Sequence, residues 1–165
     1  MALIIEDGTG VSGANSYITV AEARAFADLR NLLLPSGDAQ LEILIVKAFD
    51  YLEALDYKGE EANPPQDASF PRKNLYIQGV LFSESQVPFK LKQAQCQLSF
   101  EATSFDLQPT GDGREVLKEK VDVIEVQYAE KGISVARPTF IKVNGFLRDL
   151  VKAGSGFLSI SSIRI

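Results

Sequence analysis

The chain has 165 residues, 45% of them hydrophobic, a net charge of −5 and no histidine. This length suits one domain with its own core, and the negative charge argues against a free-standing nucleic-acid binder, whose affinity comes mainly from Lys and Arg at phosphates. The lack of histidine removes the commonest general base and most transition-metal sites. With Cys96 as its only cysteine, the chain forms no intrachain disulfide and no zinc cluster. No signal-like or membrane-spanning segment is visible, so we expect a soluble intracellular protein.

Three glycines near the N-terminus satisfy the G-x-G-x-x-G spacing of dinucleotide-binding loops. Gly8, Gly10 and Gly13 follow a short apolar run. In a nucleotide site a helix must begin at the third glycine, so that its N–H groups meet the pyrophosphate. Here polar turn formers and then Tyr17 follow instead, so we interpret the glycines as a segment that turns back on itself with positive φ.

Four helices are predicted along the chain. The first begins after a capping box formed by Thr19 and Glu22 and runs over 20–31. Apolar residues at helical spacing, with Asp38 as the cap, predict a long central helix over 39–57. Pro88 suits the first position of a third helix that reaches Phe105, and a last helix opens at residue 138 and extends to 151.

The strand signals are shorter. A small hairpin is expected around Gln78-Gly79, in the mixed segment 75–82. A strand with one irregularity is expected over about 119–129. The fold class is therefore mainly α: a small bundle of about four helices with a short β-hairpin or strand region and extended N- and C-terminal arms.

The C-terminal residues alternate between apolar and polar side chains. A flexible hinge is predicted at Gly154, Ser155 and Gly156. The following nine residues read as a strand with a bulge at Ser161-Ser162, which either pairs within its own domain or adds to the sheet of a partner.

The whole chain resembles the head-tail adaptor proteins of tailed phages and prophages, also called head-completion or neck proteins. The motifs that carry the resemblance are Ile5-Glu6-Asp7-Gly8-Thr9-Gly10-Val11, Ala14-Asn15-Ser16-Tyr17, Ala48-Phe49-Asp50-Tyr51-Leu52, Phe70-Pro71-Arg72 and Ile124-Glu125-Val126-Gln127-Tyr128. Some members of this family carry the label of a DnaT-like single-stranded DNA-binding protein. Phe70 stands where the family commonly has Trp, which keeps the aromatic bulk.

The resemblance implies a structural virion protein at the head-tail junction, made in the host cytoplasm. Its subunits would form a dodecameric ring beneath the portal protein, extend the channel for double-stranded DNA without sequence-specific binding, and offer a surface to the next neck or tail-completion protein. Residues 1–18 would be an arm that contacts a neighbouring subunit, 19–153 the helical adaptor domain, and 154–165 the docking tail. The arm contacts are assigned to Asp7, Gly8, Gly10 and Gly13. The docking residues are Phe157, Leu158, Ile160, Ile163, Arg164 and Ile165.

Two other functions are weighed against the adaptor. A single-stranded DNA-binding module needs a basic groove with exposed aromatic side chains, and the sequence approximates one loosely. The residues concerned are Phe70, Arg72, Lys73, Tyr76, Lys90 and Lys92. An enzyme is not expected, because the carboxylate pair Glu60-Glu61 lies in a polar loop and Cys96 reads as a small core residue. Neither a cofactor, a metal nor a membrane partner is expected.

Overall fold

The computed structural model describes residues 2–108, 116–120, 125–128 and 140–152. The chain divides into two compact units: Met1–Leu107 with Phe140–Ile165, and Gln108–Thr139. The first unit holds the four predicted helices and two small antiparallel hairpins, and the second holds a further two-stranded hairpin. The predicted fold class, mainly α with a short β region, is confirmed.

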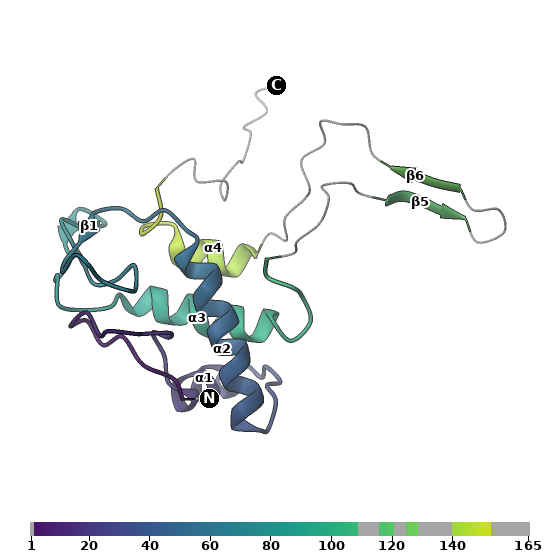
Figure 1. Ribbon diagram of the computed structural model, residues 1–165, viewed down its shortest axis with the longest axis horizontal. Coiled ribbons are helices and arrows are strands. Elements are labelled where there is room, and N and C mark those ends of the chain that lie inside the picture. The colour runs from purple at the N-terminus through teal and green to yellow at the C-terminus, as the bar shows by residue number, and fades with distance from the viewer. Residues whose placement is uncertain (1, 109–115, 121–124, 129–139, 153–165) are drawn as a thin grey trace. The chain divides into compact units, whose positions relative to one another are not determined.

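Helix α3 (Phe89–Glu101) is the centre of the first unit. Helices α1 (Val20–Asp28), α2 (Asp38–Glu53) and α4 (Ile141–Leu147) all contact it (Figure 1). Every residue from 94 to 99 is buried, including the polar Gln95, Gln97 and Ser99. A helix covered on so many sides has no single apolar stripe, so its polar residues must find partners inside the protein.

The start of α1 follows the prediction, and its end does not. The Thr19 hydroxyl accepts a hydrogen bond from the Glu22 N–H, and the Glu22 carboxylate accepts one from the Thr19 N–H, so the capping box is confirmed. The helix ends at Asp28 rather than at Asn31. Asn31 has a φ of +51°, a left-handed conformation that Asn tolerates and that turns the chain out of the helix.

Both boundaries of α2 and of α3 also differ from the predictions, and α4 ends at Leu147 rather than at residue 151. Asp38 is not the cap of α2: Gly37 is, and Asp38 instead pairs with Arg24 of α1 at 2.7 Å. The helix ends four residues before Tyr57, whose hydroxyl donates to the Leu52 carbonyl near the helix end. Pro88 is the N-cap of α3 rather than its first residue, and Phe105 lies beyond its end. Helix α4 begins at Ile141, and the predicted start at residue 138 lies outside the described residues.

The predicted hairpin around Gln78-Gly79 is confirmed. Strand β3 (Tyr76–Ile77) pairs antiparallel with β4 (Val80–Leu81), and the two turn residues have φ of +52° and +82°. Positive φ at both positions is the geometry that suits a two-residue hairpin. A second small hairpin joins β1 (Glu60–Glu61) to β2 (Arg72–Lys73).

The single strand predicted over 119–129 is wrong, because the segment forms two strands. β5 (Val116–Lys120) pairs antiparallel with β6 (Glu125–Tyr128), with a register shift between Val116 and Lys118. Of the four residues between the strands, three are β-branched and only Asp122 is a turn former, so the turn signal in the sequence is weak at that point.

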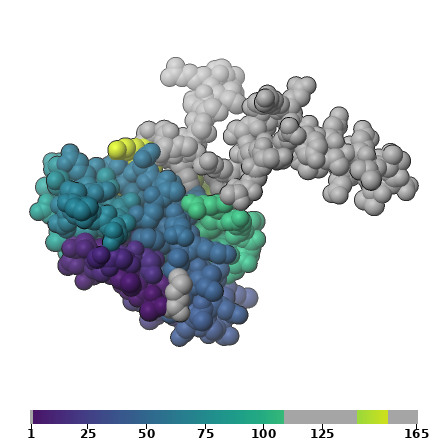
Figure 2. All heavy atoms as spheres, viewed as in Figure 1, coloured from purple at the N-terminus to yellow at the C-terminus, as the bar shows by residue number. Residues whose placement is uncertain are grey.

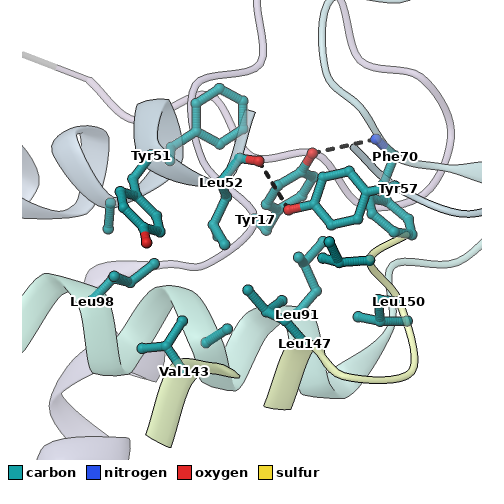
Figure 3. Packing of buried hydrophobic residues seen from close by; sticks show 14 of the residues in the cluster. Tyr17, Tyr51, Leu52, Tyr57, Phe70, Leu91, Leu98, Val143, Leu147 and Leu150 are labelled. Atoms are coloured by element: carbon teal, nitrogen blue, oxygen red, sulfur yellow. Dashed lines mark hydrogen bonds between the residues drawn. The ribbon is translucent and has the colours of Figure 1, made fainter. Parts of the chain in front are cut away.

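Aromatic residues form the centre of the core of the first unit. Phe70 is fully buried between Tyr17 and Tyr57, with ring centroids 6.2 and 4.9 Å away, and it donates its backbone N–H to the Tyr17 hydroxyl (Figure 3). That hydroxyl in turn donates to the Glu53 carboxylate, which also accepts from the Ser69 N–H. Burial raises the pKa of Glu53 above its ordinary value, against the opposing effect of these hydrogen bonds.

Gln95 joins three segments of the chain. Its side-chain oxygen accepts from the Tyr17 N–H at 2.9 Å, and its nitrogen donates to the Ser16 hydroxyl and to the Ile45 carbonyl of α2. Within the part of the chain that the structure describes, the side chain of Gln97 makes one hydrogen bond, to Glu101 one turn further along the same helix. The amide of Gln95 therefore fixes the N-terminal segment and α2 against α3.

Candidate functional site

The glycine-rich segment encloses a carboxylate of its own chain. Glu6 is 1% exposed, and its two oxygens accept hydrogen bonds from the N–H groups of Gly8, Gly10 and Val11 at 2.8, 2.9 and 2.6 Å. Successive backbone N–H groups in a tight turn form a concavity that binds anions. In this protein, the Glu6 side chain takes the place that a phosphate group holds in a nucleotide-binding loop.

The interpretation of these glycines as turn residues is confirmed. Their φ values are +110°, +80° and +71°, and α1 begins well after Gly13, at the capping box of Thr19. At Gly8 a side chain would also meet the Ser85 carbonyl, because a Cβ there would lie 2.4 Å from that oxygen. The segment follows the surface of its own unit closely, as the purple atoms in Figure 2 show.

The residues assigned to a subunit-contact arm make their described contacts within the same chain. The Gly13 N–H donates to the Asp67 carboxylate at 2.7 Å, and Gly8 lies on the backbone of Ser85. Asp7 is exposed and accepts from the N–H and hydroxyl of Thr9, bonds that lower the pKa of its carboxyl. Contact with a neighbouring subunit stays a prediction.

The structure separates the six residues of the predicted single-strand groove. Phe70 is in the core, and the Arg72 guanidinium donates to the carbonyls of Lys58, Gly59 and Ser69. Lys73 lies 3.9 Å from Glu60 across the β1–β2 hairpin. Lys92 pairs with Glu22 of α1 at 3.4 Å. Tyr76 is exposed, and Lys90 also pairs with a carboxylate but has two further cationic side chains at the same residue, Asp149.

These two belong to a surface that the sequence did not reveal. Three cationic side chains contact Asp149, which follows α4: two at its carboxylate and one at its backbone carbonyl. Lys90 Nζ lies 3.0 Å from Asp149 Oδ2, Arg148 Nε lies 3.5 Å from its Oδ1, and Lys58 Nζ donates to its backbone carbonyl at 3.1 Å. The Lys90 bond, above all, holds the pKa of the Asp149 carboxyl below its ordinary value. We call Lys58, Lys90, Arg148 and Asp149 the cationic cluster.

Two exposed aromatic residues adjoin the cationic cluster along the chain. Phe89, at the start of α3, immediately precedes Lys90 and is 72% exposed. Gln78 of the β3–β4 turn lies near Asp149, since its side chain helps to lower the pKa of that carboxyl, and Tyr76, two residues earlier, is 58% exposed. Lys58 and Arg148 were missed because they are 90 residues apart in the chain, and only the packing of α4 brings them together.

The described residues provide little for catalysis. Burial raises the pKa of the Cys96 thiol to about 12, which confirms its interpretation as a core residue rather than a nucleophile. Glu60 and Glu61 are exposed on β1, without a second buried group beside them that would separate their pKa values. No group of three or more potential metal ligands occurs among the described residues. That the chain is not an enzyme and takes no cofactor stays a prediction.

The predicted hinge at Gly154, Ser155 and Gly156 and the docking residues of 157–165 lie outside the described residues. Their roles stay predictions. Among the helices that the structure describes, none has the length and apolar character needed to span a bilayer.

A family model described as "Putative DnaT-like ssDNA binding protein" matches residues 1–165, which is the entire chain. Neither the comparison with curated proteins nor the comparison with solved structures gave a match.

Proposed function

We propose that this chain, which belongs to the family of DnaT-like ssDNA binding proteins, is a structural subunit of the head-tail junction of a tailed phage. In this proposal the subunit assembles as a dodecameric ring beneath the portal protein. The ring extends the channel for double-stranded DNA, binds the next neck or tail-completion protein and joins the capsid to the tail. The mature location is the virion neck.

Exposed apolar side chains on the helical unit are the observation that carries this proposal. Leu29 and Leu33, both in the segment that connects α1 to α2, are 84% and 85% exposed. Tyr76 and Leu81 are cross-strand partners with Val80 beside them, and all three are exposed. Adjacent exposed apolar residues are typical of surfaces that other protein chains cover. A ring subunit needs several such surfaces, because it contacts two neighbours and the proteins above and below.

Net charge also supports the adaptor. With 17 basic and 22 acidic residues, the chain carries −5 at neutral pH. A channel wall of negative charge repels phosphate, so packaged DNA can move past it without adhering. The alternating apolar residues of 157–165 suit strand addition to the portal.

The adaptor proposal is tested with purified portal rings of the phage that encodes the chain. The full chain, mixed with them at physiological salt without DNA, should add a layer of density beneath the portal in electron micrographs. Deletion of residues 155–165 should abolish this attachment, and so should Phe157→Ser with Ile160→Ser. The matched control, Ser159→Ala with Ser161→Ala, should attach normally. Unchanged attachment of the truncated chain would contradict the assigned role of the tail, and no attachment of the full chain would contradict the adaptor.

Single-stranded DNA binding is the second candidate function. The family description names this activity, so the family comparison favours it over the adaptor. The cationic cluster with its exposed aromatic neighbours is a specific feature of the kind that such binding requires. A labelled oligothymidylate should then raise its fluorescence anisotropy on addition of the full chain. Absence of binding at low salt would eliminate this function.

A further inference from the structure

We infer that the chain binds single-stranded nucleic acid at the cationic cluster, with Lys58, Lys90 and Arg148 on the phosphates and Tyr76 and Phe89 stacked on bases. This inference rests on the second proposed function. It assigns the place of binding and the chemistry of the ligand: a phosphodiester backbone with unpaired bases.

The cationic cluster differs from the other ion pairs of the described residues in its charge balance. Arg24 with Asp38, Lys73 with Glu60 and Lys92 with Glu22 are one-to-one pairs. At Asp149, Lys90 and Arg148 pair with the carboxylate and Lys58 donates to the backbone carbonyl, so the four residues of the cationic cluster carry three positive charges and one negative charge, a net charge of +2. An excess of this kind attracts an anion even on a protein whose total charge is negative.

The cations are also held in place before any ligand arrives. Lys90 spans from α3 to Asp149, and Lys58 donates to the Asp149 carbonyl from the segment after α2. Side chains that already occupy a fixed geometry lose less conformational entropy on binding. The Arg148 side chain is 71% exposed, and its Nε pairs with Asp149. The other two nitrogens of its guanidinium can therefore donate to a phosphate of the ligand.

The exposed rings decide which polyanion fits. A cationic patch alone suits any phosphate backbone, single-stranded or double-stranded. Phe89 directly precedes Lys90 in the chain, Tyr76 lies two residues before Gln78 of the turn near Asp149, and both rings are mostly exposed. Aromatic rings bind nucleic acid by stacking on bases, which is open to unpaired bases and not to those inside a duplex. The juxtaposition therefore points to a single strand.

The binding experiment uses the full chain and a fluorescein-labelled oligothymidylate of about 12 nucleotides, within the range that one single-strand module covers. Three phosphate contacts predict a log–log salt slope of about −2, or about a 20-fold loss of affinity between 50 and 200 mM salt. Lys90→Gln with Arg148→Gln should flatten that slope to about −0.7. The matched control is Lys47→Gln with Lys142→Gln, which removes the same charge from exposed positions on α2 and α4 and should leave the slope near −2.

The aromatic residues are tested separately. Tyr76→Ala should weaken oligothymidylate binding at least about fivefold, as should Phe89→Ala, while Tyr76→Phe should bind like the unaltered chain. A duplex of the same length should bind more weakly and should not respond to these changes. Circular dichroism of each variant checks that it is folded, which we expect because both side chains are exposed.

The outcomes distinguish the site from the function. If the unaltered chain binds oligothymidylate and the cluster variant keeps the slope of its control, the assigned site is wrong and the second function stands. If duplex binds as tightly as single strand and the alanine variants are unaffected, base stacking is refuted. If the unaltered chain fails to bind any single strand at low salt, the second function and this inference fail together.

Discussion

Removal of the Glu6 carboxylate should destabilise the protein strongly. In Glu6→Ala, the N–H groups of Gly8, Gly10 and Val11 lose their acceptor. A hydrogen bond to a charged group contributes roughly 1.5–3 kcal/mol, so three bonds set an upper limit of about 5–9 kcal/mol. The Gly10 and Val11 bonds are only part-buried, so water can replace the carboxylate there. We therefore expect a loss of about 3–4 kcal/mol, which in a chain of this length lowers the melting temperature by roughly 6–15 °C.

Urea unfolding followed by far-UV circular dichroism measures this loss. Glu6→Gln keeps one acceptor oxygen and should fall between Glu6→Ala and the unaltered chain. The control is Asp7→Ala, which removes an exposed carboxylate that accepts two bonds within the turn at Thr9 and should destabilise the protein much less than Glu6→Ala, because water replaces an exposed acceptor. If Glu6→Ala and Asp7→Ala differ by less than about 0.5 kcal/mol, the glycine segment does not depend on the enclosed carboxylate.

Three further outcomes are expected. In urea unfolding, Gln95→Met should lower the free energy of unfolding by about 2–3 kcal/mol, mainly because the Tyr17 N–H loses its acceptor. Gln97→Met should lower it by less than about 1 kcal/mol. Equal losses would contradict the linking role of Gln95. Because the pKa of Glu53 is raised in the folded state, ionisation of Glu53 opposes folding as pH rises above about 4.5. The stability of Glu53→Gln relative to the unaltered chain should therefore increase from pH 4 to 7. A difference in stability that stays constant over this range would refute the prediction. Melting temperatures should show that Gly8→Ala is much more destabilising than Gly79→Ala, since a Cβ meets backbone only at the first position, although both have positive φ.

The local part of the fold was predictable from the sequence. The capping box at Thr19 and the Gln78-Gly79 turn are each encoded within four residues, and both are confirmed. The wrong predictions concern features that depend on a residue far away in the sequence. Asp38 has the chemistry of an N-cap, but Arg24 of another helix provides its partner. Between β5 and β6, Asp122 is the only turn former among β-branched residues, and this weak signal led to one strand being predicted in place of two.

The candidate site shows the same division. A sequence identifies basic and aromatic residues, but it does not say which of them face water or which carboxylates neutralise them. Phe70 and Arg72 carried the right chemistry for a nucleic-acid groove, and the fold uses both internally. Lys58 and Arg148 gained significance only through the packing of α4 beside the segment after α2. The glycine spacing alone did not show what the loop encloses, because its ligand is the Glu6 side chain of the same chain and not a phosphate.

The two proposed functions place opposite demands on the same charges. A channel subunit works best when the surface that faces DNA repels phosphate, whereas a single-strand module needs positive charge there. With a total charge of −5 and a local excess of two positive charges at Asp149, the chain can satisfy both only if the cationic cluster faces away from the channel. Lys90→Gln with Arg148→Gln therefore separates them. If this variant still joins the portal and loses the oligonucleotide, the two surfaces are independent. If the variant loses the portal, and the unaltered chain does not bind the oligonucleotide, the cationic cluster is a protein contact. The exposed rings beside it then belong to the assembly.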